Sequence, residues 1–140
     1  MNVDFGILAD TAEALHGKLY LMGGAFDTLW APSVPVCCPR MSLVIRLLFT
    51  PAEEGRQHTL EVHIMDADGR RMAKVGGPIG LGPRSPQLPS GWHQGILTVL
   101  NFADLKFENF GHYSFEILVN GSSLKSIPFR VQQQASIQPQ

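Results

Sequence analysis

Histidines and carboxylates are the side chains in this sequence best suited to metal binding or acid–base chemistry. Glu61 and His63 are two residues apart, so on a strand they share one face, and His112, Ser114 and Glu116 would share another. No two histidines have the close His-x-His spacing that tight metal ligation usually uses. We therefore expect these side chains to be solvent-facing polar residues, and we expect no metal and no other cofactor.

Two short segments resemble parts of known ligand-binding loops. Asp66-Ala67-Asp68-Gly69 begins like a calcium-binding loop, but Gly77 stands where that loop needs its bidentate carboxylate. Gly80-Leu81-Gly82 begins like a dinucleotide-binding motif, but Ser85 replaces the third glycine. The first segment is therefore expected to be a β-turn, and the second is not expected to bind a nucleotide.

The possible nucleophiles have no supporting residues in the sequence. Cys37 and Cys38 are adjacent and lie beside prolines, with Arg40 as the one nearby cation. Ser90 lacks the Gly-x-Ser-x-Gly elbow, and nothing orients His93 against an acid. The sequence thus predicts no catalytic residues and a protein that is not an enzyme. A hydrolase or metalloenzyme whose site forms only in three dimensions is the less favoured alternative.

Length and charge limit the classes of binding partner that the sequence can predict. The chain has 140 residues, 44% of them hydrophobic and 16% charged, with a formal net charge of −1. The charges are scattered, which predicts neither nucleic-acid binding nor binding to an anionic membrane. Asp4 interrupts the first apolar residues, so no export signal is expected, and the apolar runs are too short to predict a membrane span. Because adjacent cysteines cannot link distant strands, a reducing, cytoplasmic setting is expected.

The clearest structural pattern lies near the end of the chain. Tyr113, Phe115, Ile117 and Val119 alternate with Ser114, Glu116 and Leu118, as in a strand with one buried face. Asn120-Gly121 then supplies a tight hairpin turn. The Gly111-x-Tyr113 spacing resembles a tyrosine corner, in which the tyrosine hydroxyl bonds to upstream backbone.

Other segments are expected to be strands, turns or connections. The apolar run over 41–49 is expected to be a central strand. Asp10 and Glu13 have capping-box spacing, which predicts at most one or two helical turns before Gly17. Three prolines, Pro32, Pro35 and Pro39, predict a crossing between sheets or a protected edge. A short strand over 72–75 should lead into an irregular connection over 76–91, which is rich in glycine and proline.

Together these patterns predict a single domain over residues 1–131. Its fold is expected to be an all-β, immunoglobulin-like antiparallel β-sandwich of about seven to eight strands. Residues 132–140 are expected to form a flexible polar C-terminal tail.

Several segments carry a family resemblance that covers nearly the whole chain. They are residues 17–27, Pro35, His58-Thr59-Leu60, residues 66–69, Gly111-x-Tyr113-x-Phe115, residues 119–121 and residues 128–131. Taken together, they resemble an uncharacterised family of short bacterial proteins of unknown function. The resemblance implies a β-sandwich and a cytoplasmic bacterial setting, and it implies no activity.

The leading functional hypothesis is a non-catalytic β-sandwich that acts through a surface, in self-assembly as a homo-oligomer or with a protein partner. Phe26, Leu29, Trp30 and Trp92 are the candidate surface residues, because aromatic side chains near loops can anchor interfaces. Each tryptophan could equally be part of the core. The alternative is a small-ligand or glycan binder in which Trp30, Trp92 and the loop over 76–91 form a stacking platform.

Overall fold

The computed structural model describes residues 1–82 and 86–135, and within them the chain forms nine β-strands and one short 3₁₀ helix. The elements are β1 (Asn2–Leu15), β2 (Lys18–Gly24), β3 (Thr28–Ala31), β4 (Val36–Phe49), η1 (Pro51–Glu53), β5 (Gln57–Asp66), β6 (Arg71–Gly80), β7 (Gln94–Phe107), β8 (Gly111–Val119) and β9 (Ser122–Gln133).

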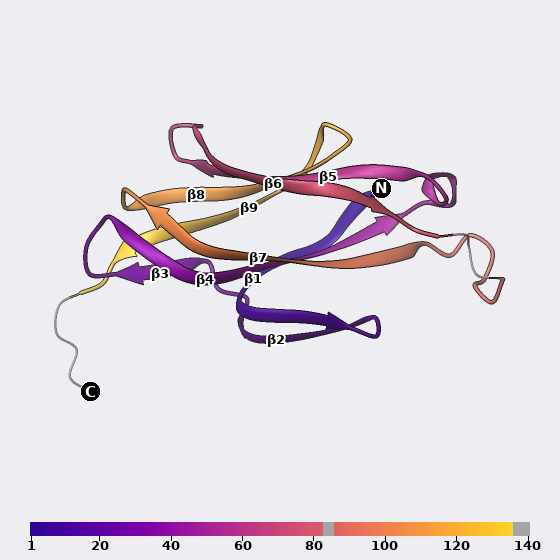
Figure 1. The fold of residues 1–140 in the computed structure, drawn as a ribbon, viewed down its shortest axis with the longest axis horizontal. Coiled ribbons are helices and arrows are strands. Elements are labelled where there is room, and N and C mark those ends of the chain that lie inside the picture. Colours follow the sequence, from indigo (N-terminus) through magenta and orange to yellow (C-terminus); the bar gives the residue numbers. More distant parts are fainter. Residues whose placement is uncertain (83–85, 136–140) are drawn as a thin grey trace.

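These strands form two sheets that pack face to face (Figure 1). One has four strands in the order β2-β1-β4-β7, and the other has five in the order β3-β9-β8-β5-β6. The β3–β9 pair is parallel, whereas the other paired strands in the described residues are antiparallel. The all-β sandwich is therefore confirmed, with nine strands rather than seven or eight and with one parallel pair.

The core between the sheets comes from alternate residues of long central strands. Leu43, Ile45 and Leu47 of β4 are fully buried, as are Phe115 and Ile117 of β8. The predicted alternation in β8 and the central position of the 41–49 run are both confirmed.

The predicted corner and hairpin are present. The Tyr113 hydroxyl donates a hydrogen bond to the Asn109 carbonyl at 2.7 Å, and Gly111 adopts a positive φ of 127° at the bend. Asn120 and Gly121 have φ values of 54° and 83°, as a tight hairpin turn with two left-handed residues requires. The Asn120 side-chain oxygen also accepts a hydrogen bond from the Thr59 N–H, so this turn is fixed to β5.

The proline-rich segment between β3 and β4 crosses from one sheet to the other, as predicted. The Asp66–Gly69 segment is a turn, also as predicted, with the Gly69 N–H donating to the Asp66 carbonyl at 3.1 Å. One Asp66 carboxylate oxygen accepts hydrogen bonds from the backbone N–H groups of Asp68 and Arg70. That carboxylate therefore stabilises the turn itself.

Two local predictions are wrong. Asp10 to Leu15 is strand rather than helix, because Thr11 and Glu13 pair with Met22 and Tyr20 across a hairpin. The segment over 76–80 is not irregular but completes β6, which pairs with β5 along its length. A Cβ at Gly76 would lie 2.3 Å from the Leu60 carbonyl oxygen, so glycine permits the close strand approach there.

The end of the chain differs slightly from expectation. β9 continues two residues past Val131, to Gln133, where it pairs with Ala31 of β3. Residues 136–140 of the predicted tail lie outside the described residues.

Candidate interaction surface

The outer face of the four-stranded sheet, turned away from the main core, carries an apolar cluster, beside polar pairs such as Arg46 with Asp4. Val44 points to this side, since its neighbours Leu43 and Ile45 belong to the main core, and yet Val44 is fully buried. Side chains that form a second cluster around it are Phe5, Ile7, Ala9, Ala12, Leu19, Leu97 and Val99. A sheet with apolar side chains on both faces needs cover on both faces.

The cover is supplied by the hairpin of β1 and β2. β1 pairs with β4 as far as Ala9, and from Ala9 to Leu15 it pairs with β2. Figure 1 shows this hairpin lying below β4 and β7, on the side opposite the five-stranded sheet. Because Ala12 and Leu19 pack in the second cluster, the hairpin forms a partial third layer over it.

The hairpin has an inner and an outer face. Cross-strand partners share a face, so Ala12 with Leu21 and Ala14 with Leu19 form the inner one. Glu13 with Tyr20, Thr11 with Met22 and Leu15 with Lys18 form the other. β2 is therefore apolar on both of its faces, although only one of them packs on the sheet.

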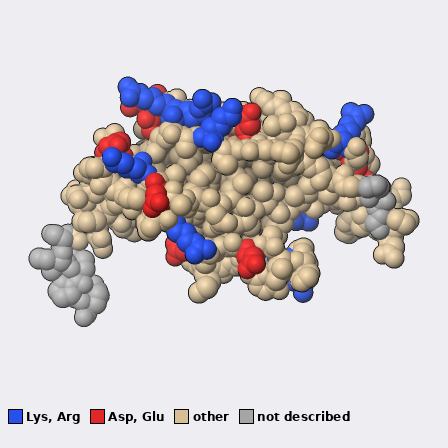
Figure 2. Space-filling view, in the orientation of Figure 1, with Lys and Arg blue, Asp and Glu red and all other residues tan. Residues whose placement is uncertain are grey.

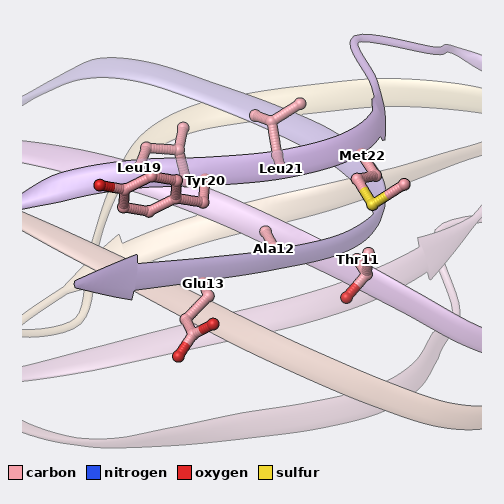
Figure 3. Close-up of a pocket in the computed structure, with 7 residues that line it drawn as sticks. All are labelled: Thr11, Ala12, Glu13, Leu19, Tyr20, Leu21 and Met22. Atoms are coloured by element: carbon pink, nitrogen blue, oxygen red, sulfur yellow. The ribbon is translucent and has the colours of Figure 1, made fainter.

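The hairpin gathers much of the exposed apolar side-chain surface of the described chain. Met22 is 71% exposed and Tyr20 is 55% exposed, and Leu15 and Leu21 are also exposed. Tyr20, Leu21 and Met22 line a groove of about 540 Å³ (Figure 3), and its other lining residues are Thr11, Ala12, Glu13 and Leu19. We call the exposed apolar residues of this hairpin, together with the flanking charges Glu13 and Lys18, the hairpin surface. Its apolar residues are Leu15, Tyr20 and Met22 from the outer face and Leu21 from the inner face.

Charged side chains are distributed differently over the two sides of the molecule. Figure 2 shows Lys, Arg, Asp and Glu side chains concentrated along its upper margin, on the side of the five-stranded sheet, and only scattered ones below. Across that sheet, His63 lies opposite Lys74 on one neighbouring strand and opposite Glu116 on the other. A hydrogen bond of 2.9 Å joins His63 Nε2 to Glu61, and this bond lowers the pKa of the Glu61 carboxyl against a smaller opposing effect of burial.

The predicted aromatic site residues are not brought together. Trp30 and Trp92 are both 61% exposed, so neither is a core residue. Phe26 and Leu29 are half-buried and pack against the main core. β3, which carries Trp30, and the segment that carries Trp92 before β7 lie at opposite ends of the sandwich (Figure 1). A single stacking platform made by the two tryptophans is therefore not formed.

The possible nucleophiles are also dispersed. Cys37 is exposed and Cys38 is half-buried, and as neighbours in β4 they point to opposite faces. Burial raises the pKa of the Cys38 thiol, which disfavours the reactive thiolate. The Arg40 guanidinium donates to the Thr11 hydroxyl at 2.9 Å, and the Cys38 thiol donates to the Arg40 backbone carbonyl at 3.3 Å. Ser90 and His93 are exposed, and Ser85 lies outside the described residues.

Within residues 1–82 and 86–135, no group of three or more His, Cys, Asp or Glu side chains is placed to hold a metal ion. The same part of the chain contains no helix that is long and apolar enough to span a membrane.

A family model described as a family of unknown function, DUF6941, matches residues 4–132, which include nearly all nine strands. The chain belongs to this family. The resemblance to an uncharacterised family is thus confirmed for this DUF6941 protein, whereas its bacterial source and its immunoglobulin-like character stay predictions. Comparison with curated proteins and with solved structures gave no match.

The hairpin surface of this DUF6941 protein was not identified from the sequence. The segment Leu19 to Met22 has apolar residues at both odd and even positions, which is the pattern of a strand that meets apolar surroundings on both sides. That pattern was the available signal for the surface.

Proposed function

We propose that this protein is a non-catalytic β-sandwich that self-associates, and that two copies pack through the hairpin surface. The observation that carries the proposal is the gathering of four exposed large apolar side chains on one hairpin, three of which, Tyr20, Leu21 and Met22, line a groove. Exposed apolar patches of this kind mark sites of protein interaction.

The chemistry of the hairpin surface favours a second copy as the occupant. Protruding side chains, Tyr20 and Met22, and an apolar groove lie on the same patch, so two copies related by a two-fold axis can fill each other's groove. The two charges, Glu13 and Lys18, cancel, and the net charge of the chain is only −1. Two copies therefore approach without strong repulsion.

The backbone of β2 supports the same occupant. β2 is an edge strand of its sheet, and no other strand of the described part of the chain pairs with its open side. In an antiparallel pair of β2 strands from two copies, those open backbone groups would bond to each other. Packing of side chains and pairing of backbone would thus act at one interface.

A non-catalytic role is supported by the dispersed titratable groups. On the outer face of the five-stranded sheet, carboxylates and histidines bind to other side chains of the same chain. Examples are the Glu61–His63 hydrogen bond and the Lys74–Glu61 ion pair. The unpaired cysteines Cys37 and Cys38 support a reducing, cytoplasmic setting as a further part of this proposal.

The test is the mass of the protein in solution by light scattering over a range of concentrations. Wild type is expected at twice the chain mass of 15.4 kDa, and Met22→Glu is expected to be monomeric because it buries an unpaired charge at the interface. Trp30→Glu is the matched control, since Trp30 is similarly exposed on another edge strand, and it should remain dimeric.

Three results would contradict the proposal. They are a wild-type monomer at every concentration, a dimer that survives Met22→Glu, and a dimer lost in Trp30→Glu alone. Thermal unfolding of each variant, followed by circular dichroism, distinguishes lost association from lost folding. If a photo-crosslinking residue at position 20 joins a different protein while the chain stays monomeric, the occupant is a partner and not a second copy.

A further inference from the structure

The two sheets have four edge strands in the described residues, and β3 and β6 resist pairing with another chain. β3 is only four residues long. β6 contains Gly76-Gly77-Pro78, and its pairing with β5 has a register shift. β2 is the edge that the proposed self-association uses. Short strands, prolines, glycines and register shifts are the usual ways in which proteins protect sheet edges.

The fourth edge, β7, has none of these protections over most of its length. β7 has 14 residues, and its segment Gln94 to Ala103 contains no charge and no proline. This segment pairs with β4 in one unbroken register, from Gln94 opposite Phe49 to Ala103 opposite Arg40. Among residues 1–82 and 86–135, no strand lies on the other side of β7, so alternate backbone N–H and C=O groups of an uncharged segment face outward.

Burial along β7 is also incomplete. Ile96, Leu100 and Phe102 pack against the main core but are only half-buried. Their neighbours on β4, such as Leu43 and Leu47, have no exposed surface at all. One more strand beyond β7 would bury the half-exposed side chains as β7 buries those of β4.

An apolar crevice of about 210 Å³ lies beside this edge, between the two sheets. Its walls include Leu60, Val75 and Ile79 from the five-stranded sheet and Thr98 and Leu100 from β7. At Gly77, which also lines the crevice, an added Cβ would meet no atom within 4 Å. The crevice is therefore open to a side chain that arrives from outside.

We propose that the β7 edge accepts an extended strand of a partner protein by β-strand addition. The added strand is uncharged over about ten residues, and one of its inward-facing side chains, of the size of valine or leucine, enters the crevice. Backbone hydrogen bonds to β7 supply affinity, and the crevice supplies selectivity for an apolar side chain.

The shape of this side of the molecule favours a lone strand over a second copy. β6 lies next to β7 across the crevice, so a second sandwich paired through its own β7 would bring its β6 against this one. A single extended strand has no such second layer to accommodate. This inference is independent of the hairpin surface, because β2 and β7 are the opposite edges of the four-stranded sheet.

The test uses a synthetic peptide of alternating leucine and threonine, with lysines at both ends, added to the full chain. Backbone amide exchange followed by NMR is expected to slow by about tenfold or more at alternate residues of Gln94 to Ala103, because bound amides are protected. The β6 amides should be unchanged. The same peptide with N-methyl groups on its edge-facing amides should not bind, since it cannot donate to β7.

Two glycine variants test the crevice. Gly77→Leu fills it and should weaken peptide binding by about tenfold, because the apolar side chain loses its site. Gly82→Leu is the matched control, since an added Cβ there also meets nothing within 4 Å and Gly82 does not line the crevice; it should bind as wild type.

The proposal is overturned if β7 amides do not respond to the peptide, if the N-methylated peptide binds equally well, or if the two glycine variants bind alike. A β7-to-β7 dimer found by light scattering, in place of peptide binding, would also overturn it. The comparison of the two peptides needs only wild-type protein, so it tests strand addition to β7 even where a glycine variant fails to fold.

Discussion

The outer faces of the two sheets differ in polarity. The five-stranded sheet presents polar side chains to solvent, with contacts such as His63 to Glu61 and Ser126 to Glu116. The four-stranded sheet presents an apolar cluster around Val44 and covers it with the β1–β2 hairpin. A polar face is complete by itself, whereas an apolar face requires cover. The hairpin that covers this cluster carries apolar side chains on its own outer side. That outer side therefore also needs cover.

The burial patterns of β8 and β4 show this difference between the sheets. β8 alternates between buried and partly exposed residues along its length. β4 has a run of five buried residues from Met41 to Ile45, because both of its faces are covered. A run of consecutive buried residues in an antiparallel sheet therefore indicates a strand that is covered on both faces.

The largest expected difference in stability is between two variants that each place a carboxylate on one outer face. Val44→Asp puts an unpaired charge in the second cluster and should cost several kcal/mol, of the order of 3–5, or prevent folding. His112→Asp on the exposed polar face, where residue 112 pairs with Arg130, should change stability by about 0.5 kcal/mol or less. Urea unfolding of both variants measures the difference. Equal losses would show that the two faces are not distinct.

A smaller loss of stability is expected when the packing of the β1–β2 hairpin on the second cluster is weakened. Leu19→Ala removes the β2 side chain that packs in the second cluster and should cost about 1–2 kcal/mol, less than a fully buried leucine. The adjacent outward-facing Tyr20→Ser should leave the stability of the monomer nearly unchanged. Hydrogen exchange should show faster exchange in β2 for the first variant alone. Equal exchange in both variants would mean that the hairpin is not held by its inner face.

The smallest effect is expected at η1, where the chain passes between the two sheets and neither outer face is involved. Burial would raise the pKa of Glu53, but hydrogen bonds from the Met1 amino group and from the Thr50 N–H and hydroxyl lower it to about 2. The amino group lies 2.7 Å from the carboxylate. Because the folded pKa is below the unfolded value of 4.5, the stabilisation is present above that value and is lost as the pH falls toward 2.

Glu53→Gln should therefore reduce stability at pH 7 by about 1 kcal/mol or less, as expected for a partly exposed pair. It should also flatten the decline of stability between about pH 5 and 2. Acetylation of the amino group should reproduce part of the loss. Unfolding by urea at several pH values makes the comparison, and an unchanged acid decline in Glu53→Gln would contradict the assignment.

The parts of the fold that depend on local chemistry were predictable from the sequence. Asn120-Gly121 makes its turn through its own backbone preferences, and Tyr113 makes its corner with a carbonyl four residues away. The β1–β2 hairpin depends on pairing instead. Asp10 and Glu13 fit a helix cap as well as a strand, and the pairing with β2 decides between them.

The candidate site was less predictable, because it depends on which apolar residues remain uncovered. Trp30 and Phe26 are both aromatic residues near prolines or glycines, yet one is exposed and the other packs on the core. Tyr20 and Met22 are no more apolar than Leu19. They form the surface because the second cluster covers only one side of β2, and that is a property of the packed layers.

The most direct test of the self-association account is hydrogen exchange of the wild-type backbone as a function of protein concentration. If two copies pack through the hairpin surface, exchange of amides in residues 18–24 should slow as concentration rises, while amides of β6 remain constant. Exchange in residues 18–24 that does not depend on concentration, or a slowing confined to other strands, would contradict the account.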